Sequence, residues 1–453
     1  MGLSQIIFLV FTSIVFYLAF RQYQRIFKNI KLGKGYASDL PKPERFKNLM
    51  LIAFGQQKMF KKFIPAILHL CIYAAFIFTQ IELIEVILDG VSGHHRIFLP
   101  FLGGFYTLMI NVIEILSFLA LLATFVFLYR RNLLKIPRFV KSDLDGWPRL
   151  DANIILLGEI VLVLAIFTMN GADAALQKAG LEHYPDTGNV FMSDWLSTFI
   201  FEGFNLQELM IFERMGWWLH LAVVYGFILY LPHSKHLHIF FAFPNVYYYN
   251  GKPRGEMSNM PAIMHEAKTM FGVDSNYNEQ SPAILEFGVN DIFGLSWKNI
   301  LDSYSCTECG RCTAVCPANL TGKKLSPRKI VMSIRDRAEE IGKNIETQSK
   351  TYYKEGSDQS ERLSALNYDD GKSLFDFISR EEIHACTTCQ ACVEACPVLI
   401  NPLEPILEMR RFEILTESAG PAEWIPMFTA MENGGSVWQM PVPRDNWKEE
   451  LEH

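Results

Sequence analysis

Charged residues are scarce in this chain of 453 residues: 20% are Asp, Glu, Lys or Arg, and half of all residues are hydrophobic. Soluble domains average about 25% charged residues, and disordered chains have few apolar ones. Cysteine is scarce too, and eight of the nine cysteines lie in two short clusters, which excludes a secreted disulfide scaffold. The sequence also lacks a glycine-rich nucleotide fingerprint, a P-loop and a nucleophile motif. The composition therefore favours a membrane protein with a metal-binding soluble part.

Long apolar stretches predict five membrane-spanning helices, because a helix needs about 20 mostly apolar residues to cross a bilayer. The stretches are 3–20, 63–81, 97–129, 152–172 and 215–232. Buried helices of a large soluble protein are the alternative, but they rarely run so far without a charge. No basic segment precedes the first stretch and no small-residue cleavage site follows it, so we expect a retained anchor rather than a signal peptide.

Lys and Arg are distributed unevenly among the loops, which predicts the orientation of the chain. Eleven lie in 21–62 and six in 130–149, whereas 89–100 holds one and 170–214 holds two. Every basic loop therefore falls on one side of the bundle. We expect the amino terminus outside and everything after residue 233 in the cytoplasm, at a bacterial inner membrane.

Two cysteine runs define the chemistry of the second half. CTECGRCTAVCP at 306–317 and CTTCQACVEACP at 386–397 share the spacing C-x2-C-x2-C-x3-C-P. This spacing is typical of bacterial four-iron–four-sulfur (4Fe–4S) clusters, in which the fourth cysteine serves the other cluster. The predicted ligand sets are Cys306, Cys309, Cys312 with Cys396, and Cys386, Cys389, Cys392 with Cys316. Zinc is the alternative, but a zinc site requires neither a third cysteine in the run nor the proline.

The segments around these runs favour an α-helical ferredoxin over a βαβ one. The first cysteines of the two runs lie 80 residues apart, whereas a compact ferredoxin separates its runs by a short hairpin. Residues 325–341 and 403–416 repeat apolar residues at helical spacing, and 345–372 has no periodicity and reads as a loop. The predicted fold class is mainly α: a five-helix transmembrane bundle followed by an α-helical ferredoxin-like domain. Cys71, alone in an apolar stretch, is expected to be buried and inert.

Histidines within or beside the apolar stretches are candidates for function, because an ionisable residue is costly inside a membrane. His69 lies near the cytoplasmic end of the second span. His220 lies near the outer end of the fifth, and His238 follows 18 residues later. In one continuous helix, His220 and His238 would share a face about 27 Å apart, too far to bind a single haem. We therefore predict that His69 and His238 are the axial ligands of one haem b, with His233 and His236 pointing away.

The other intramembrane polar residues leave several interpretations open. His220 could bind a second haem, but the second span offers no further histidine, so His94 or His95 of the outer loop would have to substitute. Alternatively, His220 could hydrogen-bond a quinone or be structural, as any isolated core histidine can be. Glu114 and Glu159 could carry protons to a quinone or pair with polar neighbours.

The membrane half resembles the cytochrome b (gamma) subunit of respiratory nitrate reductase, a five-helix protein with its amino terminus outside. The resemblance rests on His69, His220 and the run PHSKHLHIFFAFPN at 232–245. That family binds two haems and has two histidines on its second helix. Because this chain has only His69 there, the resemblance implies the inner haem and leaves the outer one open.

The soluble half resembles the iron–sulfur part of heterodisulfide reductase-like proteins and of membrane electron-transfer-flavoprotein:quinone oxidoreductases. The matching segments are WKNILDSYSCTECGRC at 297–312, TGKKLSP at 321–327 and CVEACPV at 392–398. Many fused relatives continue into Cys-Cys-Gly domains that hold a further catalytic cluster. No cysteine follows Cys396, so the resemblance implies that a separate subunit supplies this part.

Together these features predict three parts: a five-span haem b domain (1–243), a linker and packing segment (244–300) and a cytoplasmic two-cluster ferredoxin domain (301–453). The expected function is that of a membrane oxidoreductase subunit that passes electrons between a cytoplasmic partner and menaquinone or ubiquinone. The partner is a Cys-Cys-Gly-domain subunit, an electron-transfer flavoprotein or a flavin dehydrogenase, and nucleic acid is not expected. The alternative is a redox sensor or redox-linked transporter, which should carry a cavity of broken helices or an effector domain.

Overall fold

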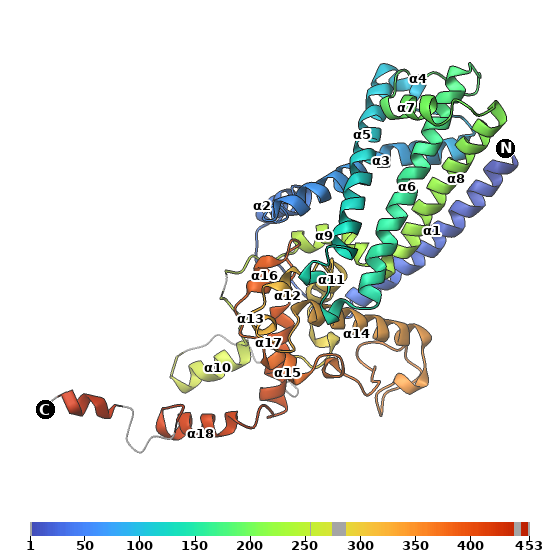
Figure 1. Cartoon of the computed structure of the whole chain (residues 1–453). Helices are drawn as coiled ribbons and strands as arrows, with labels where there is room; N and C mark the ends of the chain where they lie inside the picture. Colours follow the sequence, from blue (N-terminus) through green and yellow to red (C-terminus); the bar gives the residue numbers. More distant parts are fainter. Residues whose placement is uncertain (1, 254, 274–286, 439–444, 452–453) are drawn as a thin grey trace.

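The computed structural model describes residues 2–253, 255–273, 287–438 and 445–451. This part of the chain is mainly helical, as predicted, and contains no β-strand, only the isolated bridges Lys34–Ser296 and Tyr353–Tyr368. A bundle of long helices joins a smaller soluble domain at one of its ends (Figure 1). The amino terminus lies at the opposite end of the bundle, remote from the soluble domain.

Within the described residues, five helices are long and apolar enough to cross a membrane, as predicted. They are α1 (Leu3–Ile30), α3 (Phe63–Ser92), α5 (Gly104–Asn132), α6 (Trp147–Lys178) and α8 (Leu206–Tyr230). Most run beyond the apolar stretches because polar residues such as Arg21 and Arg25 continue the helix, for which Arg has a good propensity. The third span begins at 104 rather than 97, since Gly103 (φ 51°) separates α5 from the short α4 (Leu99–Leu102).

Small residues bring α6 and α8 into close contact. A Cβ on Gly216 of α8 would lie 2.6 Å from the backbone nitrogen of Met169 and 2.8 Å from the carbonyl oxygen of Ala165, both on α6. A Cβ on Gly158 of α6 would likewise collide with the ring of Phe227 on α8. Such small-residue contacts are how helices pack where lipid removes the hydrophobic driving force.

A buried ionic network closes the end of the bundle that carries α4 and α7 (Phe191–Phe199). The Arg96 guanidinium donates to Asp173 at 2.6 and 2.9 Å, to the Asn170 side-chain oxygen at 2.9 Å and to the Tyr106 hydroxyl at 3.0 Å. The Tyr106 hydroxyl donates in turn to Glu85 at 2.7 Å. The network therefore ties the loop after α3 to α3, α5 and α6.

The fifth span does not continue to His238, so the expected single helix through His220 and His238 is wrong. Helix α8 ends at Tyr230, and two 3₁₀ turns, Leu231–His233 and Lys235–Leu237, lead into α9 (His238–Tyr247). Pro232 has no N–H for a helical hydrogen bond, and Ser234 is extended (φ −111°, ψ 156°). The Ser234 hydroxyl then caps the second turn by accepting from the His236 N–H at 3.1 Å.

The soluble domain is built from short helices around one longer helix, α14 (Pro327–Thr347). The others are α11 (Trp297–Tyr304), α12 (Arg311–Ala314), α13 (Pro317–Leu320), α15 (Arg380–His384), α16 (Ala391–Ala395), α17 (Leu403–Arg411) and α18 (Trp424–Gly434). A π-helical turn, Phe412–Thr416, extends α17, so the helices predicted at 325–341 and 403–416 are confirmed. Between them, 348–373 is irregular apart from one 3₁₀ turn, Lys350–Tyr352, which confirms the predicted loop.

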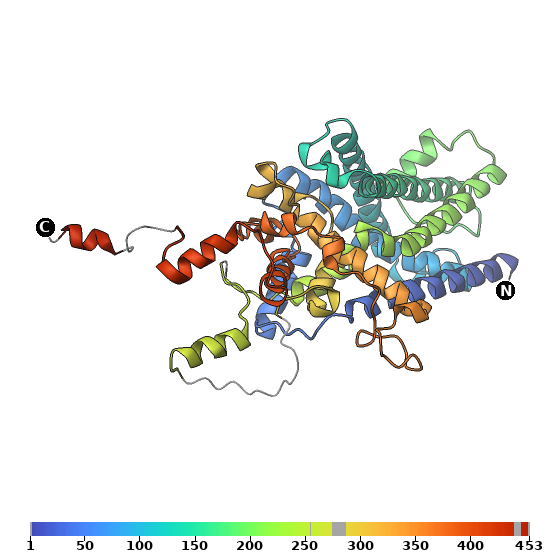
Figure 2. The same ribbon diagram turned by 90° about the horizontal axis from the view of Figure 1, so that it is seen from below.

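The remaining elements are short. They are α2 (Lys42–Asn48), the π-helix Leu49–Phe54, α10 (Pro261–Met270) and the 3₁₀ turns Pro137–Phe139, Ser142–Leu144, Ile292–Gly294, Leu374–Asp376 and Asn446–Leu451. Figure 2, which views the molecule from below, shows α10 and α18 extending away from the body of the soluble domain.

Helix α1 extends out of the bundle into the soluble domain. Ile26 and Ile30 belong to the same buried core as Ile300, Ile334 and other residues of that domain. The Asn29 amide donates to the Tyr304 hydroxyl at 3.0 Å, and Gly342 of α14 leaves the space that the Asn29 side chain occupies. The division of the chain into three parts at residues 243 and 300 stays a prediction, although α1 of the first part packs in the core of the third.

We expect Arg96→Ala to lower the free energy of unfolding by about 3–5 kcal/mol, because it leaves the buried carboxylate of Asp173 without its cation. Thermal unfolding in detergent measures the change. Arg21→Ala is the matched control, since Arg21 is exposed and bonds only to the Tyr17 hydroxyl among the contacts described. Equal melting temperatures for both variants would contradict the structural role of the network.

Candidate metal centres

The two cysteine runs form loops of the same backbone conformation. The first loop connects α11 to α12, and the second connects α15 to α16. In each loop the second and fourth residues after the first cysteine have positive φ: Glu308 (47°) and Gly310 (70°), then Thr388 (55°) and Gln390 (58°). Three of these four residues have a side chain, for which positive φ is unfavourable. Such strain persists where the surroundings impose it, often at functional sites.

The structure brings the fourth cysteine of each run close to the other run. Burial, followed by neighbouring acidic groups that include Cys396, raises the pKa of Cys306 to about 12. Burial, followed by neighbouring thiols that include Cys316, likewise raises the pKa of Cys392 to about 12. Helices α12 and α16, which follow the loops, pack against each other. The fourth cysteine of each run therefore lies near the other run, as the spacing predicts. That these cysteines bind the clusters stays a prediction.

The donor set fits 4Fe–4S clusters. The Cys396 sulfur accepts the Ile400 N–H at 3.3 Å, and the Cys386 sulfur accepts the Thr388 N–H at 3.4 Å. Hydrogen bonds to the ligand sulfurs are a known means of tuning cluster potentials. Within the described residues, no three His, Cys, Asp or Glu side chains converge on a single ion, as zinc would require. A four-iron cluster instead takes one thiolate at each iron, so its ligands stand apart.

The π-helix Leu49–Phe54 connects the surroundings of His69 and His238, since it packs against α9, which begins at His238, and leads to Gln56, the partner of His69. The His69 Nδ1 lies 3.0 Å from the Gln56 side-chain oxygen, and the His238 Nδ1 lies 2.9 Å from the Lys235 carbonyl oxygen. Both oxygens accept, so each Nδ1 carries the proton and each Nε2 keeps a lone pair. A metal-bound histidine is oriented in the same way. The two imidazoles, one from α3 and one from α9, therefore fit axial ligation of a haem.

His236 joins this pair, although it was expected to point away. Its ring lies 5.6 Å from that of His238, edge to face. Burial, followed by repulsion from His238, Lys235 and His69, lowers the pKa of His236 well below its usual value. The sequence held a sign of this proximity, because His236 and His238 are two residues apart and follow Pro232, which interrupts the helix. The prediction of one continuous helix missed it.

The other polar residues of the bundle are mostly engaged. His95 Nε2 lies 3.1 Å from Asp173, and Glu159 accepts from the Thr124 hydroxyl at 3.1 Å. Glu114 accepts the Ser193 N–H at 3.1 Å and also the Ser193 hydroxyl. His94 is exposed, and Cys71 is half-buried rather than buried.

His220 differs from these residues. Its side chain is buried in α8, and its Nδ1 has no hydrogen-bond partner. The structure therefore leaves its role open.

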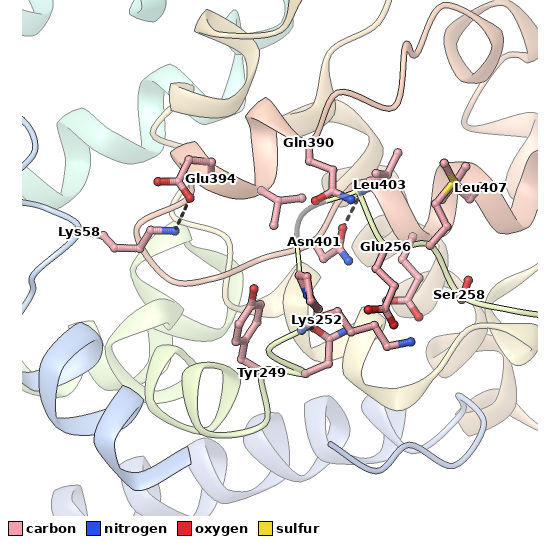
Figure 3. Close-up of a pocket in the computed structure, with 15 residues that line it drawn as sticks. Lys58, Tyr249, Lys252, Glu256, Ser258, Gln390, Glu394, Asn401, Leu403 and Leu407 are labelled. Atoms are coloured by element: carbon pink, nitrogen blue, oxygen red, sulfur yellow. Dashed lines mark hydrogen bonds and ion pairs between the residues drawn. The ribbon is translucent and has the colours of Figure 1, made fainter. Parts of the chain in front are cut away.

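A cleft of about 80 Å³ lies beside the second cysteine run (Figure 3). It is lined on one side by residues of 249–258 and on the other by Gln390, Glu394 and residues of α17. Lys58 points toward Glu394 across the cleft, with 4.0 Å between the charged atoms. Pockets for cofactor-sized ligands are roughly 300 Å³ or larger, so this cleft is too small to hold one.

Comparisons with known proteins agree with the iron–sulfur assignment. Residues 305–400 match the family described as "4Fe-4S dicluster domain". The "Probable iron-sulfur-binding oxidoreductase FadF" of Bacillus subtilis is 27% identical over 99% of this chain and 61% of its own length. The "EtfAB:quinone oxidoreductase" of Syntrophomonas wolfei is 27% identical over 87% of this chain and 52% of its own length.

A third relative is the "Probable membrane-anchored ferredoxin" of Chromohalobacter salexigens, 33% identical over 36% of this chain and 24% of its own length. The chain thus spans about half to three fifths of the first two relatives. No solved structure gave a significant match. The predicted iron–sulfur domain is confirmed, and the relatives fit a membrane electron-transfer protein. The likeness of the membrane half to the nitrate reductase subunit stays a prediction.

We expect Cys316→Ser to alter the electron paramagnetic resonance signal of the cluster held by Cys386, Cys389 and Cys392, because Cys316 lies beside that run. Spectra of the reduced protein measure the change. Cys71→Ser is the control and should leave both signals as they are, since Cys71 lies in α3. If Cys316→Ser removed only the signal of its own run, the cross-ligated arrangement would be wrong.

Proposed function

We propose that this chain is the membrane electron-transfer subunit of an oxidoreductase. It passes electrons between a cytoplasmic redox partner and the quinone pool through two 4Fe–4S clusters and haem b. The observation that carries the proposal is the position of α9, which touches both kinds of predicted redox site.

Helix α9 begins with His238, the proposed haem ligand. The carbonyl oxygen of Phe241, one turn later, accepts from the hydroxyl of Ser305 at 3.0 Å, and Ser305 directly precedes Cys306. The Asn245 amide donates at 2.9 Å to the carbonyl of Val398, two residues after Cys396. Cys306 and Cys396 belong to one predicted ligand set. The segment from His238 to Asn245 is about 10 Å long, so α9 links that cluster to the haem over a short path.

The chain's contribution at the haem is to hold two imidazoles in fixed orientations. Gln56 fixes His69, and the Lys235 carbonyl fixes His238. A bound haem b would supply a one-electron carrier at the end of the bundle next to the clusters. Helix α3 offers no second histidine that could pair with His220 as a haem ligand, and His95 is already bonded to Asp173. Both points support one haem rather than two.

The contacts of the basic loops support the proposed orientation. The Arg311 guanidinium, in the first cysteine run, donates to the Lys58 carbonyl at 3.4 Å, and Gly310 packs on the Arg138 carbonyl. Lys58 and Arg138 belong to the two Lys- and Arg-rich loops, which therefore lie at the cluster end. Because such loops remain cytoplasmic, we place the clusters in the cytoplasm and the amino terminus outside, at a bacterial inner membrane.

The quinone site is proposed at the inner interface, beside the π-helix Leu49–Phe54. This helix packs against α9, where the rings of Phe54 and Phe243 lie 4.8 Å apart. It precedes Gln56, the partner of His69, and exposes Met50 and Leu51. Single π-helical turns are frequent at functional sites. The candidates Glu114 and Glu159 already have partners, whereas His220 has none, and the packing of the π-helix against α9 makes the inner site the better supported one.

The partner is proposed to be a flavoprotein or a Cys-Cys-Gly-domain subunit. The printed name of the Syntrophomonas relative joins EtfAB to quinone and favours an electron-transfer flavoprotein over a flavin dehydrogenase. The relatives are longer than this chain, so a Cys-Cys-Gly subunit that supplies their additional part stays among the proposals. No residue of this chain is assigned a catalytic role in the partner's reaction.

The haem content should be one haem b per chain by the pyridine haemochrome assay. His69→Ala and His238→Ala should each abolish it, because a bis-imidazole site needs both ligands, whereas His220→Ala should retain it. A content of two, with one lost in His220→Ala, would show that the outer half of the bundle binds a haem after all.

The quinone site should respond to Leu51→Glu, which places a charge on the exposed face of the π-helix. We expect oxidation of the dithionite-reduced protein by a menaquinone analogue to slow roughly tenfold, a loss of about 1.4 kcal/mol. Stopped-flow spectra of the haem measure it, and haem content should not change. His220→Ala is the comparison. If His220→Ala slowed the reaction and Leu51→Glu did not, the site would be the outer one.

A further inference from the structure

We propose that electrons enter this chain at the second cysteine run, and that the surface around Cys389 docks a soluble flavoprotein. We call this surface the docking face and define it by Val315, Leu320, Thr387 and Cys389. The inference rests on the proposed function, and it adds the order of the two clusters and the place where the partner binds.

The first cysteine run is covered by the membrane domain and by α14. Glu308 and Arg311 are 5% and 7% exposed. Glu308 pairs with Arg328 of α14 at 2.8 Å, and Arg311 donates to the Lys58 carbonyl at 3.4 Å. A Cβ on Gly310 would stand 3.2 Å from the Arg138 carbonyl oxygen, so no partner protein could approach this loop from that side.

The second run has the same spacing and backbone but opposite surroundings. Thr388, Gln390 and Ala391 stand where the first run has Glu308, Gly310 and Arg311, so the ion pair of Glu308 and the contact of Arg311 have no counterpart at these positions. Further along the run, Glu394 pairs with Lys61 of the basic loop. Thr387 is exposed. Of the eight predicted ligands, Cys389 is exposed and the other seven are buried or half-buried. The cluster of this run therefore lies nearer the solvent.

Apolar side chains extend the exposed surface. Cys316, the predicted fourth ligand of this cluster, is flanked by Val315 (39% exposed) and followed by Leu320 (66% exposed). Cys316 lies in the same buried cluster as Ala385, and Cys386 packs against this cluster, which places these apolar residues beside the second run. Small contact areas of this kind are typical of transient redox encounters.

The rim of the docking face carries lysines. Lys323 is exposed and lines a depression together with Ala385, the residue before Cys386. Lys324 is exposed as well and pairs with Glu381 at 2.6 Å. Rim charges guide the approach of a partner while the apolar centre makes the contact. Because Glu381 offsets the charge of Lys324, Lys323 carries the positive charge of this rim. The matching face is therefore apolar with an acidic group opposite Lys323, on a protein that releases electrons singly, as a flavin can.

The order of transfer follows from these positions. With clusters bound, the docked partner would lose one electron to the cluster held by the second run, and that electron would pass to the cluster held by the first run, with no bond broken and no proton transferred. The packing of α12 against α16 keeps the two sites adjacent. From the first run, the contacts of Ser305 and Val398 with α9 lead to His238.

Spin relaxation of the two reduced clusters tests the exposure directly, without measuring activity. Dysprosium–EDTA in solution speeds the relaxation of the cluster nearer to it, and Cys316→Ser and Cys396→Ser identify the two signals. We expect the cluster of the second run to be relaxed several-fold more strongly in the detergent-solubilised full chain. Equal enhancement, or a stronger effect on the other cluster, would overturn the proposed order.

Docking is tested with a purified, photoreduced electron-transfer flavoprotein as the probe. Leu320→Glu should lower the second-order rate constant at which the flavoprotein reduces the clusters roughly tenfold, because the substitution places a charge in the apolar part of the contact. Reduction by dithionite should not change. Leu366→Glu, at an 88% exposed position of the 345–372 loop, is the matched control and should match the unaltered chain. A rate unaffected by Leu320→Glu overturns the docking face.

The two proposals fail in different ways. If a menaquinone analogue does not oxidise the dithionite-reduced chain, the proposed function is wrong, whatever the relaxation experiment gives. If it does so while both clusters relax equally, the function stands and the point at which electrons enter is wrong.

Discussion

Helix α9 hydrogen-bonds to segments beside Cys306 and Cys396, two residues that lie 90 positions apart, and this contact fixes where the soluble domain sits on the bundle. The buried Lys298 strengthens the contact, because its ammonium bridges the Asn245 side-chain oxygen at 2.9 Å and Asp302 at 2.7 Å. A buried cation is tolerated only where such partners satisfy it. The same helix carries His238 at its first position. One short element therefore sets both the docking of the domains and the spacing of the proposed redox sites.

The cysteine chemistry was predictable because spacing alone determines it. Short intervals between cysteines force the chain around a cluster, so the iron–sulfur domain was predictable without knowledge of the fold, while the exchange of Cys316 and Cys396 as ligands stays a prediction. The number of spans followed from the length of apolar stretches for a similarly simple reason. What spacing could not give is which loop is covered, since Gly310 and Gln390 occupy the same place in the two runs and only the fold shows that the Arg138 carbonyl packs on Gly310.

The polar residues of the bundle were harder to foresee. Glu82 and Glu85 follow directly on the predicted span 63–81, and Asp173 follows on 152–172, so hydropathy placed all three outside the membrane helices. In the structure these helices continue, and all three carboxylates are buried around Arg96 and its partners. The break before His238 was missed for the opposite reason: helical periodicity was extended through Pro232, which cannot donate the hydrogen bond that a continuous helix needs.

The extension of α1 into the soluble core bears on how the protein is assembled. Without α1, the core would lose Ile26 and Ile30, and the Tyr304 hydroxyl would lose the Asn29 amide in a buried position. An unsatisfied buried hydroxyl alone costs roughly 1–3 kcal/mol. Helix α1 is thus shared between the bundle and the soluble core, although Ile30 and Ile300 lie 270 positions apart along the chain. Because α1 also belongs to the bundle, the soluble core is complete only with this membrane helix in place, so moving the cysteine-bearing domain to another anchor should leave its core without Ile26, Ile30 and Asn29.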